Sequence, residues 1–519
     1  MKNKNQESTA KKGNLWKKLI IAPAIAVALF LISLAVVFPK SDVFVTELGD
    51  HLPTSPTDYL FGYRFIVDKA QIDTSSVDTA KVGHYQAYAS LLFYRYSIEI
   101  KVEDTTPPEI TPFSDPLYIA SGRDYKPEDF AEEISDISGS VKNTLKYGGS
   151  QWESISFPMP GNYSVVIESE DPSGNIGSQK IEFTVDDPPV IIGAFDRHLP
   201  VGTDFDPSSA VAVDSGDGNL TEKMTVDQGG FQPDSEGDYT VTYTVADSHG
   251  LETEKSVVIS ICGKDRLSAY KDESDSFALT YDELKLMCDV DFFKYKPLDT
   301  PDYERVVEMI EPTLLDLKQN RGGGSYAAGS GCIYNITPEY IYMLSVRHVM
   351  KEVAYNCDIM FFNGVIVNER LKFATSGIHN ELALFRIPVS DVPMDTLLRL
   401  RQVFVDRDIY SKLFEGDDVV AFAKHWTGTD EDLIRSMKVR TITTSIKEFS
   451  LINSLLETSS GVVSGMSGTA VVDYKGNLVG LSSAIGPSTT NRHLVSCYHS
   501  KIDVLDETES ALEEMDRAA

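Results

Sequence analysis

The chain has 519 residues, of which 42% are hydrophobic and 24% are charged. At about 150 residues per domain this length predicts three to four domains. The composition is that of folded globular domains, which excludes a wholly disordered chain. Aspartates and glutamates number 78 against 47 lysines and arginines, a net charge of -31. We therefore expect no nucleic-acid partner, because the phosphate backbone is itself an anion.

The charge is unevenly distributed along the chain. Residues 1–18 carry six lysines and one glutamate, a net charge of +5, which leaves -36 for the rest. Residues 19–38 follow with no charged side chain. A helix of that length spans about 30 Å, the thickness of a hydrocarbon core. The sequence therefore predicts a transmembrane helix over residues 19–38.

A cleaved secretory signal is the alternative for this segment. The apolar region of such a signal typically has about 7 to 15 residues and ends at small residues. Here the apolar run ends Val-Val-Phe-Pro-Lys, which favours an uncleaved anchor in the lipid bilayer. By the positive-inside rule the N-terminus is cytoplasmic and the C-terminal domains are extracellular, so we expect a single-pass protein of the cell membrane.

A Gly-x-Tyr motif recurs at Gly83, Gly161 and Gly237. After each motif, apolar and polar residues alternate and are rich in Val, Ile, Tyr and Thr. This period of two, interrupted by Asp-x-x-Gly turns, predicts antiparallel hairpins with one buried face. Each repeat is therefore expected to form one β-rich module.

Proline pairs at 107–108 and 188–189 mark the module boundaries, because proline cannot continue a hydrogen-bonded ladder. The expected modules cover residues 41–106, 107–187 and 188–263. The segment GDYTVTYTVADSHG, preceded by VDSGDGNLTEKMTV, resembles the tandem immunoglobulin-like modules of bacterial cell-surface proteins. That resemblance implies β-sandwiches that act as a stalk or bind a cell-surface ligand.

Three polar residues of the third module, Asp214, Asp217 and Asn219, have side chains that Ca²⁺ accepts as ligands. Their spacing differs from that of an EF-hand loop, and such clusters more often form solvated turns. We therefore expect no metal site there, and no cofactor.

Residues 264–321 lose the alternation and are expected to form a partly helical connector. Apolar residues at helical spacing predict one buried helix face, although Pro312 should divide the run. These residues are Val306, Val307, Ile310, Leu314 and Leu317.

Three short pieces of the last segment, about residues 322–510, together supply the parts needed to hydrolyse an amide. Ser467 lies between glycines in Gly-Met-Ser-Gly and offers a hydroxyl nucleophile. His348 ends an apolar strand-like run and offers a general base. Glu381 begins the run ELALFRI and offers a carboxylate to orient the imidazole.

The order and context of these pieces resemble the trypsin-like (chymotrypsin-fold) serine peptidases, and more closely the HtrA-like branch. The matching pieces are Gly329-Ser330-Gly331, Ser345-Val346-Arg347-His348-Val349, Glu381-Leu382-Ala383-Leu384 and Gly465-Met466-Ser467-Gly468-Thr469. The resemblance implies a double β-barrel in which His348, Glu381 and Ser467 form the catalytic triad. It also implies an oxyanion hole made by the backbone amides of Gly465 and Ser467.

Several features depart from that family or leave a choice open. The acid is Glu381 where most members have aspartate, Ser464 is a second hydroxyl near Ser467, and His379 is expected at the surface. Only nine residues follow position 510, so we expect no peptide-binding PDZ domain.

The resemblance also places the substrate pocket at uncharged residues, which favours a small or apolar substrate residue. They are Gly461, Ser483, Ala484 and Ile485. An extracellular location permits disulfides, and the pairs Cys332–Cys357 and Cys262–Cys288 are expected candidates.

Two functions follow from the sequence. The first is a membrane-anchored extracellular serine endopeptidase acting on a protein or peptide substrate. The alternative is a surface adhesion or scaffold protein whose peptidase-like domain is non-catalytic.

Overall fold

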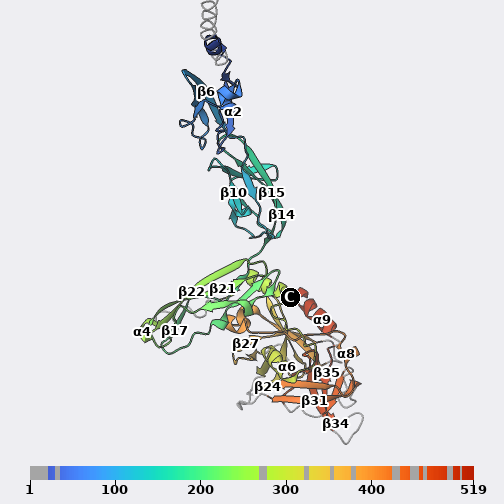
Figure 1. The fold of residues 1–519 in the computed structure, drawn as a ribbon. Helices are drawn as coiled ribbons and strands as arrows, with labels where there is room; N and C mark the ends of the chain where they lie inside the picture. The colour runs from blue at the N-terminus through green and yellow to red at the C-terminus, as the bar shows by residue number, and fades with distance from the viewer. Residues whose placement is uncertain are drawn as a thin grey trace, which may run out of the picture. The chain divides into compact units, whose positions relative to one another are not determined.

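The computed structural model divides into two compact units, residues 1–186 and 187–519, which are described separately (Figure 1). It describes residues 22–29, 36–267, 278–320, 326–350, 356–375, 381–423, 433–444, 455–459, 465–487, 495–502 and 505–518. Of the span predicted over residues 19–38, residues 22–29 form a helix and 36–38 are also described. Among the described residues no helix is both long enough and apolar enough to cross a bilayer.

The first module is a four-stranded sheet in the order β2-β6-β5-β4, flanked by two short helices. Its elements are β1 (Phe38–Pro39), β2 (Val43–Glu47), α2 (Pro56–Tyr59), β3 (Leu60–Phe61), α3 (Arg64–Val67), β4 (Gln71–Asp73), β5 (Gly83–Leu91) and β6 (Tyr94–Glu103). Alternate residues of β6, namely Ile98, Ile100 and Val102, are fully buried, as the period of two predicts.

The second module places β12-β11-β14-β15-β8 in one sheet, with β10-β7 and β13-β9 as two-stranded ribbons. Its elements are β7 (Glu109–Thr111), β8 (Tyr118–Ala120), β9 (Asp124–Tyr125), η1 (Pro127–Phe130), β10 (Glu133–Ser135), β11 (Lys142–Tyr147), β12 (Ser150–Trp152), β13 (Ile155–Ser156), β14 (Gly161–Glu170) and β15 (Ile176–Asp186). The core of the module is rich in aromatic residues, and the ring of Phe183 contacts the rings of both Phe130 and Phe157.

The third module begins the second unit and has two layers, β17-β22-β21-β20 and β16-β18-β19. Its elements are β16 (Val190–Ile192), β17 (Arg197–Pro200), η2 (Pro207–Ser209), β18 (Val211–Asp214), β19 (Gly218–Asn219), η3 (Thr221–Lys223), β20 (Thr225–Asp227), β21 (Gly237–Ala246) and β22 (Glu252–Cys262). In each of the three modules an early strand pairs in parallel with the last strand, as β2 with β6, β8 with β15 and β17 with β22.

The Gly-x-Tyr repeat has one structural cause in all three modules. The tyrosine two residues after the glycine donates its hydroxyl to a carbonyl four residues upstream: Tyr85 to Lys81 at 2.8 Å, Tyr163 to Met159 at 3.0 Å, and Tyr239 to Ser235 at 3.1 Å. The tyrosine ring lies over the glycine, where a Cβ atom would come within about 3.5 Å of it. This arrangement is a tyrosine corner, which fixes how the chain enters the long hairpin.

The rest of the second unit consists of a seven-stranded sheet and a closed barrel. The sheet has the order β27-β26-β23-β24-β25-β29-β28, and the barrel has the order β30-β31-β32-β35-β34-β33. The sheet strands are β23 (Leu314–Asn320), β24 (Tyr326–Ile336), β25 (Tyr340–Val346), β26 (Asn356–Phe361), β27 (Ile366–Arg370), β28 (Lys372–Thr375) and β29 (Leu382–Pro388). The barrel strands are β30 (Asp418–Ala423), β31 (Leu433–Thr444), β32 (Leu455–Ser459), β33 (Ala470–Asp473), β34 (Leu478–Pro487) and β35 (Val495–Ser500). Of the two expected barrels, the described residues therefore show one closed barrel and a partner in the form of a sheet.

Helical segments of this unit are short apart from the last one. They are α4 (Lys264–Leu267), α5 (Tyr281–Asp289), α6 (Tyr303–Ile310), η5 (Glu311–Thr313), η6 (Val389–Asp391), α7 (Met394–Leu397), α8 (Ile409–Lys412) and α9 (Leu505–Ala518). The expected mainly β chain is confirmed.

The helical run predicted through Pro312 ends earlier than its periodicity indicates. Helix α6 ends at Ile310, and Pro312 lies in the short turn η5. Leu314 and Leu317, predicted on a helical face, lie instead on β23, which pairs with β24 on one side and β26 on the other. Proline ends the α-helix, and the residues that follow are buried as a central strand of the sheet.

Both disulfides expected from the sequence are wrong, because none of the four cysteines concerned is disulfide-bonded. Cys332 pairs across β23 with Leu314, whereas Cys357 pairs across the opposite edge of β23 with Gln319. Two strand spacings of about 4.8 Å each, plus five residues along the strand, put the two thiols far beyond the Cα separation of about 4.4 to 6.8 Å that a disulfide needs. Cys262 and Cys288 form separate sulfur contacts, with the carbonyls of Ser260 and Ile336.

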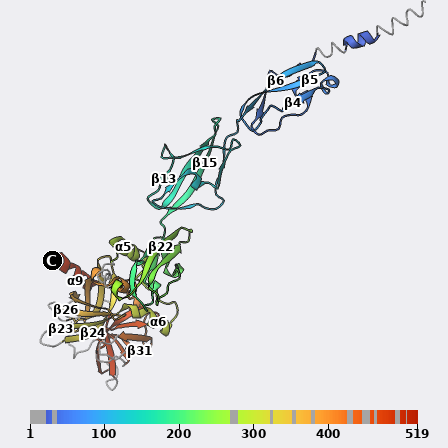
Figure 2. The same ribbon diagram turned by 90° about the vertical axis from the view of Figure 1, so that its left-hand side faces the viewer.

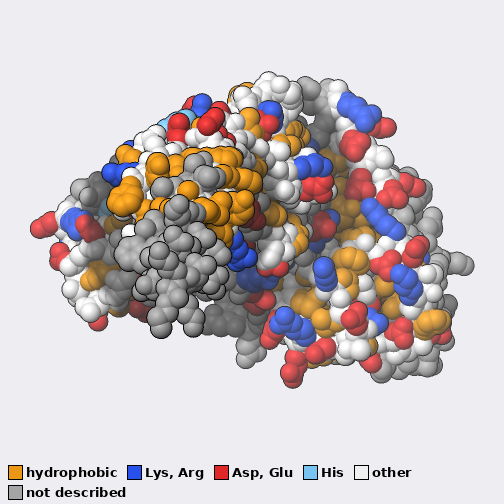
Figure 3. All heavy atoms as spheres, turned by 45° about the horizontal axis from the view of Figure 1, so that its top comes forward, with side chains coloured by type: hydrophobic (Ala, Val, Ile, Leu, Met, Phe, Trp, Pro, Cys, Tyr) orange, Lys and Arg blue, Asp and Glu red, His pale blue; other side chains and the backbone are white. Residues whose placement is uncertain are grey.

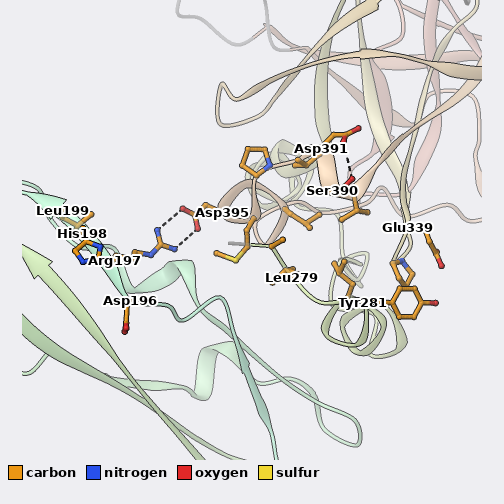
Figure 4. A pocket seen from close by; sticks show the side chains of 18 residues that line it. Asp196, Arg197, His198, Leu199, Leu279, Tyr281, Glu339, Ser390, Asp391 and Asp395 are labelled. Atoms are coloured by element: carbon orange, nitrogen blue, oxygen red, sulfur yellow. Dashed lines mark hydrogen bonds and ion pairs between the residues drawn. The ribbon is translucent and has the colours of Figure 1, made fainter. Parts of the chain in front are cut away.

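The third module packs against the C-terminal part of its unit (Figures 1 and 2). Ile192, Val211 and Val213 belong to the same buried cluster as the core of the C-terminal part. Arg197 makes a two-pronged ion pair with Asp395, with N–O distances of 2.9 and 3.1 Å, beside a cavity of about 730 Å³ (Figure 4). The third module is thus joined to the C-terminal part by a shared core and a charged clamp.

We expect loss of the Tyr239 hydroxyl to loosen the third module alone. Tyr239→Phe keeps the ring and removes one hydrogen bond, which costs about 1 kcal/mol. Because about 1.4 kcal/mol corresponds to a factor of ten, amides of β21 and β22 should exchange about fivefold faster in hydrogen-exchange mass spectrometry.

The matched control is Tyr163→Phe, which should produce the same change in β14 and β15 and leave the third module as it was. Equal exchange in Tyr239→Phe and the wild type would contradict a stabilising role for the corner.

Candidate active site

His348 and Glu381 are brought together by strand pairing. Strand β25 pairs with β29, with Val346 opposite Leu382, so the residues just beyond these two positions emerge side by side. His348 Nδ1 lies 2.8 Å from Glu381 Oε2, and the His348 amide donates to the same oxygen at 3.2 Å. The Arg347 amide donates to the Glu381 carbonyl at 2.6 Å and fixes the backbone on both sides of the pair.

The ionisation of Glu381 decides which imidazole nitrogen carries the proton. Burial raises the pKa of Glu381, but hydrogen bonds with His348 and its positive form outweigh burial, so the pKa lies below its ordinary value. Glu381 is therefore a carboxylate at neutral pH and can only accept hydrogen bonds. Nδ1 of a neutral His348 must then be the donor, which leaves Nε2 as a basic lone pair.

Ser467 lies in a tight turn just before β33. The Thr469 amide donates to the Met466 carbonyl at 3.1 Å, and Gly468 between them has φ +88°. A positive φ at the third residue is the requirement of a type II turn, which glycine meets without strain. The Met466 side chain is fully buried and anchors the turn, whereas Ser467 is only half-buried.

Two glycines allow this turn to lie against the sheet that carries His348. A Cβ on Gly329 would come within 2.6 Å of Val349 and 2.7 Å of the Ser467 carbonyl. A Cβ on Gly468 would come within 2.1 Å of the Ser330 carbonyl. At both contacts only glycine permits the backbones to approach this closely.

A short hydrogen-bond path also connects the turn to β25. The Ser330 amide donates to the Ser467 carbonyl at 2.7 Å, and the Ser345 hydroxyl donates to the Ser330 carbonyl at 2.7 Å. Ser345 lies on the strand that ends before His348. The described hydrogen bonds do not include one from the Ser467 hydroxyl to the His348 ring. Such catalytic bonds often shorten only when substrate binds.

Two backbone amides of the turn are the candidates for the oxyanion hole that the sequence predicts. Gly465 has φ +97°, and within the described part of the chain the amides of Gly465 and Ser467 donate to no backbone carbonyl. Amides that donate to no described backbone carbonyl are candidates for stabilising a developing oxyanion.

The expected substrate pocket is partly described. Gly461 lies outside the described residues, as do the alternative hydroxyl Ser464 and the histidine His379. Ser483 and Ala484 are half-buried on β34, and Ile485 is 43% exposed. These three side chains are uncharged.

A buried histidine that the sequence did not single out supports the turn from inside the barrel. His499 is fully buried, with Nε2 2.8 Å from the Thr458 hydroxyl and Nδ1 3.2 Å from the Ser482 hydroxyl. The backbone carbonyl of Ser482 in turn accepts from the Gly468 amide at 2.7 Å. Because hydroxyl partners from separate strands meet only in the folded barrel, no local pattern marks His499.

The polar cluster of the third module is used within turns. Asp214 accepts from the amides of Gly216 and Asp217 at 2.8 Å, and Asn219 accepts from the amide of Thr221 at 3.0 Å. Side chains that accept local amides in this way are typical of Asx turns.

Comparisons with known proteins match this chain to two different groups. Residues 190–261 match the family described as bacterial surface protein, Ig-like domain. The pesticidal crystal protein Cry22Aa of Bacillus thuringiensis is 24% identical over 220 residues, covering 39% of this chain and 29% of Cry22Aa. The prediction of an immunoglobulin-like module is therefore confirmed for the third module.

Solved structures similar to this chain include three proteins of low identity. The HtrA-type protease AlgW with tripeptide is 19% identical with a TM-score of 0.32, covering 42% of this chain and 63% of AlgW. Deg5 is 16% identical with a TM-score of 0.30, covering 39% and 90%. The inactive form of Rv3671c from M. tuberculosis is 14% identical with a TM-score of 0.30, covering 42% and 97%. This chain spans less than two thirds of AlgW and under a third of Cry22Aa. These likenesses concern the fold alone, so residue roles rest on the geometry of this chain.

Acid should destabilise the barrel through His499. Burial lowers the pKa of His499 to about 3, so it stays neutral in the folded state while an unfolded histidine takes up a proton below about pH 6.5. The stabilisation is therefore complete above pH 6.5 and is lost as the pH falls towards 3. Between pH 6.5 and 5 the loss should be about 1.5 kcal/mol.

Hydrogen exchange of β32 and β35, corrected for the intrinsic rate, measures this loss. His499→Gln can still hydrogen-bond and does not titrate, so its stability should change less with pH. A parallel pH dependence of the variant and the wild type would contradict a neutral buried His499.

Proposed function

We propose that the chain is a serine endopeptidase that cleaves peptide bonds through a His348–Glu381–Ser467 triad and a covalent acyl-enzyme. The observation that carries the proposal is the 2.8 Å bond between His348 Nδ1 and Glu381 Oε2. This pair stands beside a glycine-flanked serine turn that is bonded to the same sheet. The proposal includes the HtrA-like branch of the trypsin-like peptidases.

In this mechanism the Ser467 hydroxyl attacks the carbonyl carbon of the scissile bond while His348 Nε2 takes its proton. Glu381 stays ionised and stabilises the imidazolium that forms. The amides of Gly465 and Ser467 stabilise the oxyanion. His348 then gives its proton to the leaving amine, and water hydrolyses the ester in a second round of the same steps.

Glutamate in place of aspartate is compatible with this role. The longer side chain reaches Nδ1 at an ordinary hydrogen-bond distance and also accepts from the His348 amide. Two bonds to one residue hold the carboxylate in place in spite of its extra rotatable bond. The uncharged side chains of Ser483, Ala484 and Ile485 support a preference for a small or apolar substrate residue.

The proposal also places the chain in the cell membrane, with residues 19–38 as the anchor, the N-terminus cytoplasmic and the modules outside. The first module supports this with exposed aromatic side chains. Phe38 and Phe61 pair at 5.0 Å between ring centroids, and both are half exposed. The face that comes forward in Figure 3 carries a gathering of hydrophobic side chains.

The hairpin between β5 and β6 also exposes apolar side chains. Its two-residue turn is Leu92-Phe93, where turns of this length favour Asn-Gly. Leu92 has φ +53° and Phe93 is 98% exposed. Strand β6 starts at this turn, and β1 with Phe38 also contacts β6. Phe and Leu side chains are typical of the apolar surfaces that enter the membrane interface.

Labelling with a fluorophosphonate probe tests the nucleophile. The wild-type chain should be labelled, and Ser467→Ala and His348→Ala should abolish labelling. Glu381→Gln should slow labelling by up to about 10⁴-fold, because the imidazole loses its orienting carboxylate. Glu381→Asp should keep much of the rate.

Ser464→Ala and His379→Ala are matched controls that should label like the wild type. Labelling that persists in Ser467→Ala would overturn the nucleophile assignment. No labelling of well-folded wild type would favour the non-catalytic adhesion or scaffold function, with the modules binding a cell-surface ligand.

The membrane proposal predicts that Phe93 contacts lipid in the anchored protein. In phosphatidylglycerol–phosphatidylcholine vesicles, Phe93→Trp should add blue-shifted fluorescence that brominated lipids quench. Phe113→Trp in the second module should be insensitive to the brominated lipids. If the protein is inserted but the Phe93→Trp fluorescence is that of a water-exposed tryptophan, the lipid contact of Phe93 is contradicted and the anchor is not. If alkaline carbonate extracts the protein from the vesicles, the anchor itself is contradicted.

A further inference from the structure

Three aspartates meet at the junction between the first two modules, inside one compact unit. Asp104 directly follows β6 of the first module, Asp136 follows β10, and Asp171 follows β14 of the second module. One carboxylate oxygen from each lies within 4.8 Å of those offered by the other two. The three carboxylates come from different segments of the chain, and their oxygens are close enough together to coordinate one cation.

The Asp104 side chain is buried and under-satisfied. Only 6% of the residue is exposed, and Oδ1 is buried without a hydrogen-bond partner. Oδ2 receives a long bond of 3.5 Å from the Ser173 hydroxyl. A buried carboxylate oxygen without a partner is costly, so its presence points to a ligand that the protein itself does not supply.

The surroundings of Asp104 add negative charge. Burial and the charges of Asp171, Asp136 and Glu47 raise the pKa of Asp104 and outweigh a backbone hydrogen bond from Thr106 that lowers it. Glu47 is already occupied, since it accepts from the amides of Thr105 and Thr106 at 2.6 and 3.2 Å. A cation between the carboxylates would offset this repulsion.

The other two carboxylates are held in fixed orientations. Asp171 accepts from the amides of Ser173 and Asn175 at 2.8 and 2.9 Å and from the Asn175 side chain at 2.8 Å. Asp136 accepts from the Ser138 amide at 2.8 Å. A carboxylate has about four lone-pair sites, so each retains capacity for a ligand.

We propose that Asp104, Asp136 and Asp171 bind one Ca²⁺ at the junction of the first and second modules. Ca²⁺ takes oxygen ligands at about 2.3 to 2.6 Å, so oxygens on opposite sides of it are up to about 5 Å apart, which accommodates the observed separation. Mg²⁺ fits less well, because it dehydrates reluctantly and keeps several waters.

The bound ion links the linker to two loops of the second module. The junction already has direct contacts: the Asn175 side chain donates to the Asp104 carbonyl at 2.9 Å, and a Cβ on Gly177 would come within 2.0 Å of the Pro108 carbonyl. Bound Ca²⁺ adds a further connection between the two modules. The occupancy of this connection depends on the Ca²⁺ concentration. The junction is therefore stiffer in an environment rich in Ca²⁺.

Hydrogen exchange of the full chain in detergent micelles, with CaCl₂ or with a chelator, tests the proposal. Extracellular modules bind Ca²⁺ with Kd of about 10⁻⁴ to 10⁻³ M, so about 10 mM should slow exchange around the three aspartates by about 10- to 100-fold. Asp104→Asn should abolish this response. Without Ca²⁺ the Asp104→Asn variant should exchange no faster than the wild type, because the substitution removes charge repulsion. If Asp104 had a structural role only, the variant would exchange faster than the wild type in both buffers.

Asp115→Asn, at an exposed position of the second module, is the matched control and should respond like the wild type. If Asp104→Asn does not fold, Asp136→Asn provides the same test from the other module. The proposal is overturned if the wild type does not respond to Ca²⁺, if the Asp104 or Asp136 variants keep the full response, or if Asp115→Asn reduces it equally.

Discussion

The candidate site depends on a close approach of backbone to backbone at Gly329 and Gly468. Both positions leave no room for a Cβ, and together they bring the Ser467 turn onto the strands that lead to His348. Side chains at either position would separate the closed barrel from the seven-stranded sheet. The placement of the candidate triad residues therefore depends on two residues that carry no functional group.

The charged pair and the serine turn are held by different kinds of structure. His348 and Glu381 are neighbours because two strands pair in a fixed register, so their contact follows directly from the sheet. Ser467 is placed by a type II turn whose Gly468 amide donates to the Ser482 carbonyl, and the Ser482 hydroxyl contacts the buried His499. Because Glu381 is ionised and accepts from Nδ1, Nε2 of a neutral His348 is the nitrogen that can take up a proton.

The three modules share one design and differ in how they are joined. Each uses a tyrosine corner and a parallel pairing between an early and the last strand. The first two meet at a cluster of carboxylates, whereas the third shares its core with the C-terminal part and is clamped by Arg197 and Asp395. A hydrophobic interface of this kind makes the third module part of the C-terminal unit.

The sequence by itself determined the features that depend on nearby residues: the β alternation, the Gly-x-Tyr hairpins, and the residue types suited to amide hydrolysis. It failed where packing overrides a local pattern, as at Leu314 and Leu317, which look helical and form a buried strand. Only the tertiary structure decided that Gly329 touches the Ser467 turn, that His499 supports it, and that Asp104 is buried beside Asp171. These contacts join residues far apart in the chain, and their geometry is set by strand register and core packing, which no local pattern encodes.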